Sequence, residues 1–189
     1  MKIRMAWVTL GIMLLTCGQA YAQNPSRYAR PGFYIGAGGL YAIEDFDNTF
    51  GLDFKNSPGF NGRLGYRFHP NIAVEAMIER VDAFDLKGFN NNVEINTWTG
   101  TLNGKFFALT ERFQPYGLLG IGAMRAKANL PGSANDYHDT DIAFRIGVGL
   151  DSYITENWLV NLEISNVRPT GDVDDINYYS FGGGIQFRF

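Results

Sequence analysis

The chain is dominated by a period of two, in which apolar residues alternate with small or polar ones through eight separate stretches. Because successive side chains of a β-strand point to opposite faces, each stretch predicts a strand with one apolar face. The expected strands lie within residues 33–41, 60–68, 72–79, 97–106, 115–125, 142–151, 158–165 and 179–189. In the fifth stretch Leu118 and Leu119 interrupt the alternation, which leaves its register open and points to a β-bulge.

Two architectures produce such alternation: a water-soluble barrel or sandwich with the apolar face inside, and a membrane barrel with that face in lipid. The solvent face of a soluble sheet is usually rich in Lys and Glu. Here the face opposite the apolar one carries mainly Gly, Ser, Thr and Asn, with isolated charges. Such residues suit the narrow interior of an eight-stranded barrel, which side chains just fill. The pattern predicts an all-β fold, an eight-stranded antiparallel up-and-down transmembrane barrel.

The connections between the expected strands alternate strictly between short and long, which is typical of outer-membrane barrels with periplasmic turns and outer loops. The short ones lie near residues 69–71, 110–112 and 155–157, and the long ones cover residues 44–57, 83–93, 127–140 and 169–176. Aromatic residues near the strand ends predict two girdles at the membrane interfaces. They are Phe33, Phe68, Phe106, Tyr116, Trp158 and Phe187 at the turn side, and Tyr41, Phe60, Trp98, Tyr179 and Phe181 at the loop side.

The N-terminal segment is predicted to be a secretory signal peptide. Two basic residues precede the apolar run 5–15, which is shorter than the roughly 20 residues that a transmembrane helix needs. Ala20 and Ala22 supply the small residues of a cleavage site, so the mature chain is expected to start at Gln23. The alternative is a lipoprotein modified at Cys17, although the preceding threonine matches a lipobox poorly.

These boundaries predict three segments: a cleaved signal peptide at 1–22, a short periplasmic lead-in at 23–31 and one barrel domain at 32–189, with no further domain. Cleavage would lower the number of basic residues from 16 to 14, leave all 19 acidic ones and remove the single cysteine. No disulfide is therefore expected. The acidic balance and the lack of a basic block exclude a nucleic-acid binder.

The sequence resembles the small outer-membrane β-barrel family of Gram-negative bacteria, the OmpX and OmpA type of porin-like barrel. The resemblance rests on the signal peptide, the eight strands, the Gly-rich stretch Gly32–Gly39 and the ending Phe187-Arg188-Phe189, and it covers residues 31–189. It implies a location in the outer membrane and contact with its lipid and lipopolysaccharide. It also implies that Phe187 and Phe189 form an assembly signal read by the barrel-assembly machinery. The motifs are specific for the fold and weak for the activity, because one scaffold hosts many functions.

The predicted register places nine charged residues inside the barrel. They are Arg63, Arg67, Lys105, Arg145 and Arg188, with Glu75, Glu79, Asp151 and Glu163. The expected heights are mid-barrel for Arg63, Glu79, Arg145 and Glu163, and closer to the periplasmic end for Arg67, Glu75, Lys105 and Asp151. Because a buried charge without a partner is costly, we expect these eight to form ion-paired layers that plug the lumen. The alternative is a narrow polar path lined by the same residues.

No catalytic site is expected. The fragment Glu163-Ile164-Ser165-Asn166 resembles the His-x-Ser-Asn stretch of outer-membrane lipid A deacylases, but glutamate stands at the histidine position. A serine nucleophile needs a nearby base. The two histidines are His69, expected in a periplasmic turn, and His138, expected in an outer loop. A lipid A hydrolase is a remote alternative that requires His138 beside Ser165.

No cofactor and no metal site is expected either. Carboxylates suit hard cations, but two acidic clusters of the outer loops match no EF-hand spacing, and solvated loop tips explain them. The clusters are Asp136, Asp139 and Asp141, and Asp172, Asp174 and Asp175. Capture of calcium or magnesium is the alternative. The same loops are aromatic, which often marks a contact surface; these residues are Phe46, Phe50, Phe54, Phe84, Phe89 and Tyr137.

Three classes of function follow. The favoured one is a structural or surface-interaction protein of the outer membrane, whose loops contact lipopolysaccharide, a host surface or other envelope proteins around a plugged lumen. The second is a small porin or a hydrophobic-solute channel of the OmpW type, favoured if the lumen opens laterally. The third is the lipid enzyme.

Overall fold

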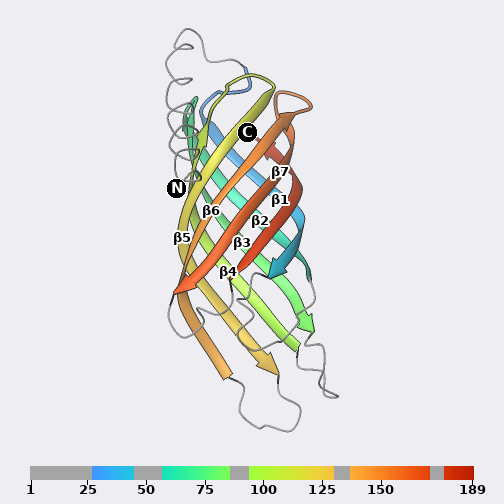
Figure 1. Cartoon of the computed structure of the whole chain (residues 1–189). Coiled ribbons are helices and arrows are strands. Elements are labelled where there is room, and N and C mark those ends of the chain that lie inside the picture. Colours follow the sequence, from blue (N-terminus) through green and yellow to red (C-terminus); the bar gives the residue numbers. More distant parts are fainter. Residues whose placement is uncertain (1–26, 45–56, 86–93, 130–136, 171–176) are drawn as a thin grey trace, which may run out of the picture.

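The structure, a computed structural model, is a closed antiparallel barrel (Figure 1). It describes residues 27–44, 57–85, 94–129, 137–170 and 177–189. Its strands are β1 (Gly32–Glu44), β2 (Ser57–His69), β3 (Ile72–Asp85), β4 (Glu94–Phe107), β5 (Phe113–Asn129), β6 (Tyr137–Tyr153), β7 (Trp158–Thr170) and β8 (Tyr178–Arg188). Each strand pairs with the next and β8 pairs with β1, so the sheet has no free edge. The predicted eight-stranded up-and-down topology is confirmed. The expected signal peptide and Cys17 lie outside the described residues.

The two faces of the sheet are reversed relative to a soluble protein. Leu64, Ile146 and Val148 face outward and are 54%, 59% and 61% exposed, whereas Lys105 and Glu75 are fully buried inside the barrel. An outward apolar surface around the whole barrel is stable in lipid, where it needs no cover. No helix among the described residues has the length and apolar character needed to cross a membrane.

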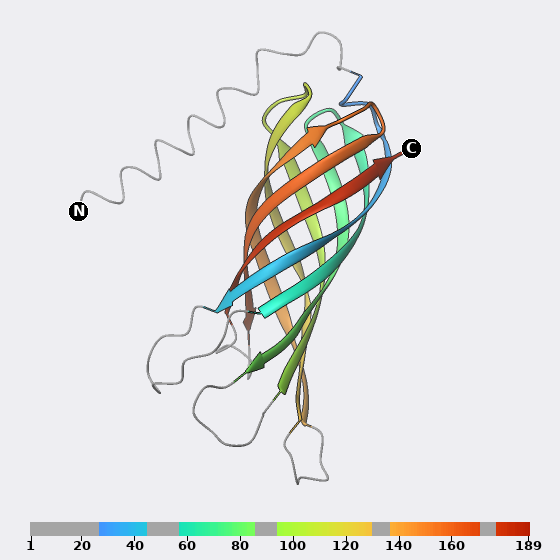
Figure 2. The same ribbon diagram turned by 90° about the vertical axis from the view of Figure 1, so that its right-hand side faces the viewer.

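The ends of the barrel differ in the way that the sequence predicted. Tight turns join β2 to β3, β4 to β5 and β6 to β7 at one end, called here the turn end, where the C-terminus also lies (Figure 2). Backbone hydrogen bonds fix these turns, including Phe107 N to Asn71 O at 2.8 Å and Arg188 N to Asn157 O at 2.8 Å. The opposite end, the loop end, carries the longer connections.

Strand β5 corrects two expectations. It pairs with β4 and β6 without a register shift, so the expected bulge at Leu118 and Leu119 is wrong. Leu118 points into the lumen and Leu119 points outward, which makes both faces of β5 locally apolar and hides the alternation. The same register buries Tyr116 in the lumen, so it does not belong to the turn-side girdle. The remaining girdle aromatics except Phe187 are exposed on the outer surface.

The hairpin of β5 and β6 is longer than expected. The two strands remain paired as far as Lys127 with His138 and Ala128 with Tyr137, inside the segment 127–140 that was expected to be a loop. Residues 137–141 are Tyr-His-Asp-Thr-Asp, a sequence without apolar alternation, although the backbone pairing continues. Asp139 and Asp141 therefore lie on a strand and not at a loop tip.

Candidate functional site

The middle of the lumen is crossed by an ion-paired network centred on Glu163 of β7. Its Oε2 accepts hydrogen bonds from Arg63 Nη1 at 3.2 Å and from Tyr116 Oη at 2.9 Å. Its Oε1 lies 3.5 Å from Arg145 Nη1, and Arg145 Nη2 donates to Glu79 Oε2 at 2.7 Å. Because the partners come from β2, β3, β5, β6 and β7, the network ties opposite walls of the barrel together.

The same network continues toward the turn end. Glu75 lies 3.7 Å from Arg63 Nη1 and 3.6 Å from Lys105 Nζ, and it accepts a hydrogen bond from the Tyr34 hydroxyl at 3.0 Å. Lys105 Nζ also donates to Asp151 Oδ2 at 3.3 Å. The structure thus brings seven of the eight predicted residues, all buried, into one connected network. A network without a gap between its members leaves little room for a water-filled path.

Arg67 is the predicted member that lies outside this network. Its Nη1 donates to Gln114 Oε1 at 2.7 Å, its Nε donates to the Pro70 carbonyl at 3.1 Å, and its guanidinium stacks 4.0 Å from the centre of the Phe107 ring. All of these partners are neutral. The strand register predicted from the sequence could not show that Arg67 binds neutral groups, because Gln114 belongs to the strand whose register was left open.

Residues 27–30, called here the N-terminal lid, pack against lumen side chains at the turn end. The carbonyl oxygen of Tyr28 accepts hydrogen bonds from Arg188 Nη1 at 2.6 Å, Gln114 Nε2 at 3.2 Å and Arg67 Nη1 at 3.4 Å. The tyrosine ring lies 5.3 Å from that of Tyr153. The expected lead-in is therefore part of the barrel's packing, at least over these residues.

Two apolar clusters pack against the charged network. The cluster at the loop end comprises Leu40, Ala42, Val81, Met124, Ala143, Val167 and Tyr178. The cluster in the turn half comprises Tyr34, Ala73, Phe107, Tyr116 and Leu118. Tyrosine hydroxyls connect clusters and network, since the Tyr178 hydroxyl donates to Glu79 Oε1 at 2.7 Å. Sequence reasoning missed these tyrosines as partners, although the alternation already placed Tyr34 on the inner face.

Comparison with known proteins decides the family. The sequence profile of the outer membrane protein β-barrel domain matches residues 9–189. The chain belongs to this family. It is an integral β-barrel protein of the outer membrane, as the resemblance implied.

This outer-membrane barrel is similar to three further proteins. A 22 kDa outer membrane protein of Rhizobium leguminosarum bv. viciae is 23% identical over 161 residues, which cover 82% of this chain and 72% of the relative. Neisserial surface protein A is 16% identical with a TM-score of 0.64, covering 84% of this chain and 97% of the other. Ail of Yersinia pestis, in complex with the heparin analogue sucrose octasulfate, is 21% identical with a TM-score of 0.62, covering 85% and 99%. At these identities the structural likeness concerns the fold.

The outer surface of this outer-membrane barrel carries two arginines, Arg80 and Arg125, in one row of side chains at the loop end. This pair is called here the arginine row. Arg80, Trp98, Arg125 and Thr140 lie directly opposite one another across β3, β4, β5 and β6. The Arg80 guanidinium lies 5.3 Å from the centre of the Trp98 ring. Arg125 is exposed, as is Arg168 on β7. Basic groups thus occur at the level of the loop-side aromatic girdle, where lipid headgroups lie.

The fragment that resembles a lipid A deacylase lies in the lumen of this barrel. Ser165 is buried, faces Gly147 and Ser180 in register, and its Oγ has no hydrogen-bond partner among the described residues. Glu163 is engaged with Arg63 and Arg145. His69 is the last residue of β2, at the turn end of the barrel, and the His138 side chain is not described.

The predicted cation and contact sites of the loops lie mostly beyond the described part of the chain. Within the described residues, no group of three His, Cys, Asp or Glu side chains is placed to hold a metal ion. Outside them lie Asp136, Asp172, Asp174, Asp175, Phe46, Phe50, Phe54 and Phe89. The side chains of Phe84, Tyr137 and Asp139 are likewise not described.

Proposed function

We propose that this outer-membrane protein is a closed barrel that anchors a binding surface at its loop end, and that it does not conduct solutes. The observation that carries the proposal is the connected ion-paired network from Glu79 to Asp151. Each of its carboxylates contacts at least one buried cation. Opening a path through it would strand buried charges, and removing one partner of such a pair typically costs about 3–5 kcal/mol.

Two further layers support closure. The apolar cluster at the loop end lies beyond the network on the outer side, and the N-terminal lid covers the lumen at the turn end. A conducting pore needs a continuous path along which water or polar groups solvate the ion. Along this lumen the lid, the charged network and the apolar cluster follow one another, and each of them interrupts such a path.

We infer that the binding surface includes the arginine row and that its partner carries phosphate or sulfate groups, as lipopolysaccharide does. Arginine pairs with such groups through two parallel hydrogen bonds, and a neighbouring indole adds an interfacial anchor. Arg80 on β3 and Arg125 on β5 each lie directly opposite Trp98 of β4, so the two arginines flank the same indole. The solved complex of Ail with sucrose octasulfate supports a sulfated or phosphorylated partner for a barrel of this fold.

Planar-bilayer recording of the refolded protein tests closure. We expect the wild type to be silent, and Glu79→Gln and Arg145→Ala to show brief, noisy openings, because each variant removes one side of the 2.7 Å pair. Steady current through the wild type would contradict closure and make the protein a small porin, with the interior charges as its selectivity filter.

Binding of lipopolysaccharide to the protein in nanodiscs tests the partner. We expect Arg125→Gln to weaken binding and the weakening to shrink at high salt, since exposed charges are screened. Arg112→Gln, an exposed arginine in a turn at the other end, is the matched control and should bind as the wild type does. Equal affinity of both variants would remove the arginine row from the proposal.

We propose cleavage after Ala22, recognition of Phe187 and Phe189 during assembly, and no enzymatic activity. The exposed Phe189 ring packs edge-on against Phe187 at 5.2 Å, which presents an apolar end to a partner. Glu163 stands where the deacylase stretch has histidine and is held in ion pairs by Arg63 and Arg145, which supports the absence of acyl-transfer chemistry at Ser165.

A further inference from the structure

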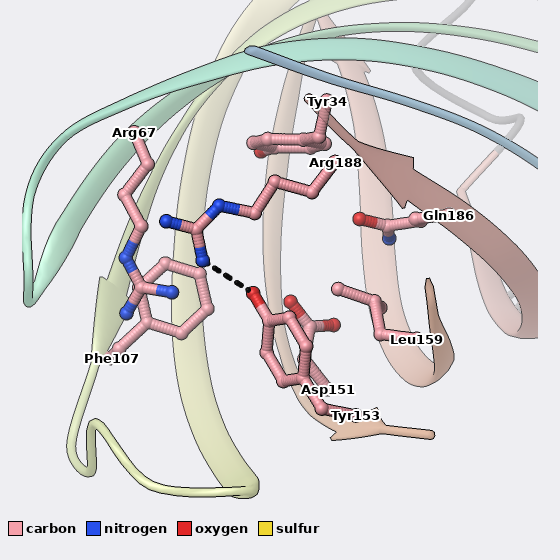
Figure 3. A pocket seen from close by; sticks show the side chains of 8 residues that line it. All are labelled: Tyr34, Arg67, Phe107, Asp151, Tyr153, Leu159, Gln186 and Arg188. Atoms are coloured by element: carbon pink, nitrogen blue, oxygen red, sulfur yellow. Dashed lines mark hydrogen bonds between the residues drawn. The ribbon is translucent and has the colours of Figure 1, made fainter. Parts of the chain in front are cut away.

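A small cavity lies in the turn half of the lumen, where it is lined by Arg67 and Arg188, which bind the N-terminal lid, and by Asp151 of the charged network (Figure 3). The volume open to the centre of a water-sized sphere is about 10 Å³ there. It is lined by Tyr34, Arg67, Phe107, Asp151, Tyr153, Leu159, Gln186 and Arg188. A space of this size accepts one particle of about the size of a water molecule. Its occupant is therefore a water molecule or a monatomic ion.

The charge around the cavity is positive. Arg67 and Arg188 are 3% and 2% exposed, and both donate to the Tyr28 carbonyl oxygen, which places their donating nitrogens within about 6 Å of each other. The acidic member of the lining, Asp151, already binds Lys105 through Oδ2. Two like charges held this close in a buried site repel strongly, because the interior screens them poorly.

The lumen as a whole also contains more positive than negative charge. The buried charged side chains of the described residues comprise five cations and four carboxylates. Arg63, Arg145 and Lys105 belong to the ion-paired network, whereas the partners of Arg67 and Arg188 are carbonyls, an amide and a hydroxyl. The unmatched positive charge is therefore located at the cavity.

Arg188 also presents the chemical group that would hold an anion. Its Nη1 donates to Tyr28 O at 2.6 Å and to the Tyr153 hydroxyl at 3.3 Å. Its Nε and Nη2 are buried without a hydrogen-bond partner among the described residues. These two nitrogens form the forked edge with which arginine binds anions. Arg63 Nε and Arg145 Nε are also unpartnered among the described residues, but at Arg188 two adjacent donors are, and such donors are destabilising unless an acceptor is present.

We propose that the cavity beside Arg67 and Arg188 is a binding site for one monatomic anion, chloride in physiological salt. Arg188 binds the ion through Nε and Nη2, and Arg67 supplies the second positive charge. The bound anion balances the charge of the lumen. It also stabilises the lid, because it removes the repulsion between the two guanidiniums that hold the Tyr28 carbonyl.

Bromide, which replaces chloride and scatters X-rays anomalously, is the probe. Crystals of the refolded protein grown with sodium bromide are expected to show an anomalous peak in this cavity, next to Arg188. A water molecule is the competing occupant, since water would also donate to the unpartnered Asp151 Oδ1. Density without an anomalous signal would mean water and would overturn the proposal.

Thermal unfolding gives the second measurement. In sodium chloride we expect a Tm on the order of 2–4 °C higher than in sodium gluconate of equal ionic strength, because gluconate is too large for the cavity. Arg188→Gln should abolish the difference, whereas Arg168→Gln, at an exposed arginine on the outer surface, should keep it. Equal Tm values of the wild type in both salts would contradict the site. If Arg188→Gln fails to fold, the bromide peak and the salt dependence of the wild type and of Arg168→Gln still decide.

Discussion

Each carboxylate oxygen of Glu163 has its own cation: Oε2 contacts Arg63 and Oε1 contacts Arg145. The residue therefore joins two ion pairs that the barrel wall supplies from different strands. Alternation along the strands was sufficient to predict that Glu163, Arg63 and Arg145 face the lumen. Which of them pair depends on side-chain reach across the lumen, and alternation carries no information on that.

Replacement of Arg145 tests how strongly the network stabilises the barrel. Arg145→Met leaves Glu79 and Glu163 with fewer cationic partners in a buried site, so we expect a loss of about 3–5 kcal/mol in the free energy of unfolding. Urea unfolding in lipid vesicles, followed by tryptophan fluorescence, measures this loss. Arg168→Met, at an exposed arginine on the outer surface, is the matched control and should change stability by less than about 1 kcal/mol.

The double variant separates pairing from packing. If Arg145 and Glu79 act as a pair, the double variant Arg145→Met with Glu79→Gln should lose less stability than the sum of the two single variants. The reason is that the second change removes the charge that the first change left without its partner. Additive losses would show that the 2.7 Å contact contributes nothing beyond the space its side chains fill.

At the scale of the strand, inner glycines and outer glycines have different roles. Gly65 on β2 faces the lumen, and a Cβ atom there would overlap the Tyr34 ring. Gly100 on β4 faces outward, with nothing within 4 Å of the corresponding Cβ position. The alternation predicted which face each glycine occupies. It could not show that the first makes room for a tyrosine whose hydroxyl binds Glu75.

This difference predicts opposite outcomes for the same substitution. Gly65→Ala should displace Tyr34 and weaken its 3.0 Å hydrogen bond to Glu75, with a loss of about 1–3 kcal/mol typical of overpacking. Gly100→Ala adds one methyl group on the lipid side and should leave the free energy of unfolding unchanged or slightly raised. Urea unfolding of the two variants in the same vesicles checks the pair. Equal losses would mean that the strand backbone, and not the lumen, limits both positions.

The limits of the sequence reading are clearest in strand β5. The other seven strands show alternation because their inner faces are mainly small or polar, whereas β5 contributes Tyr116 and Leu118 to an apolar cluster inside the lumen. Both of its faces are then apolar, and the period disappears. The same physical cause accounts for the wrong bulge and for the assignment of Tyr116 to the outer girdle. The lid was hidden for a different reason: its main contact is a backbone carbonyl, at Tyr28, which no side-chain pattern records.

In the whole molecule, an ion moving along the lumen would have to pass two barriers one after the other. The first is the lid at the turn end, and the second is the charged network with its apolar cluster. Flow through a series is limited by its tightest member, so opening either end alone should leave conduction small. A variant that begins at Pro31 lacks the lid but keeps the Glu79–Arg145 pair, and we expect it to remain silent in planar bilayers. The network variant Arg145→Ala with the lid present should give only brief openings. The two changes together should give steady current, larger than the sum of the separate ones.

Glu156→Gln is the control for the truncation, since it removes the exposed ion pairs of Arg27 and Arg30 while leaving the Tyr28 carbonyl in place. Exposed pairs contribute little, so this variant should behave as the wild type does. Steady current through the variant that begins at Pro31 would show that the lid alone closes the barrel. The buried charges would then line an open path, and their spacing along the lumen would determine which ions pass.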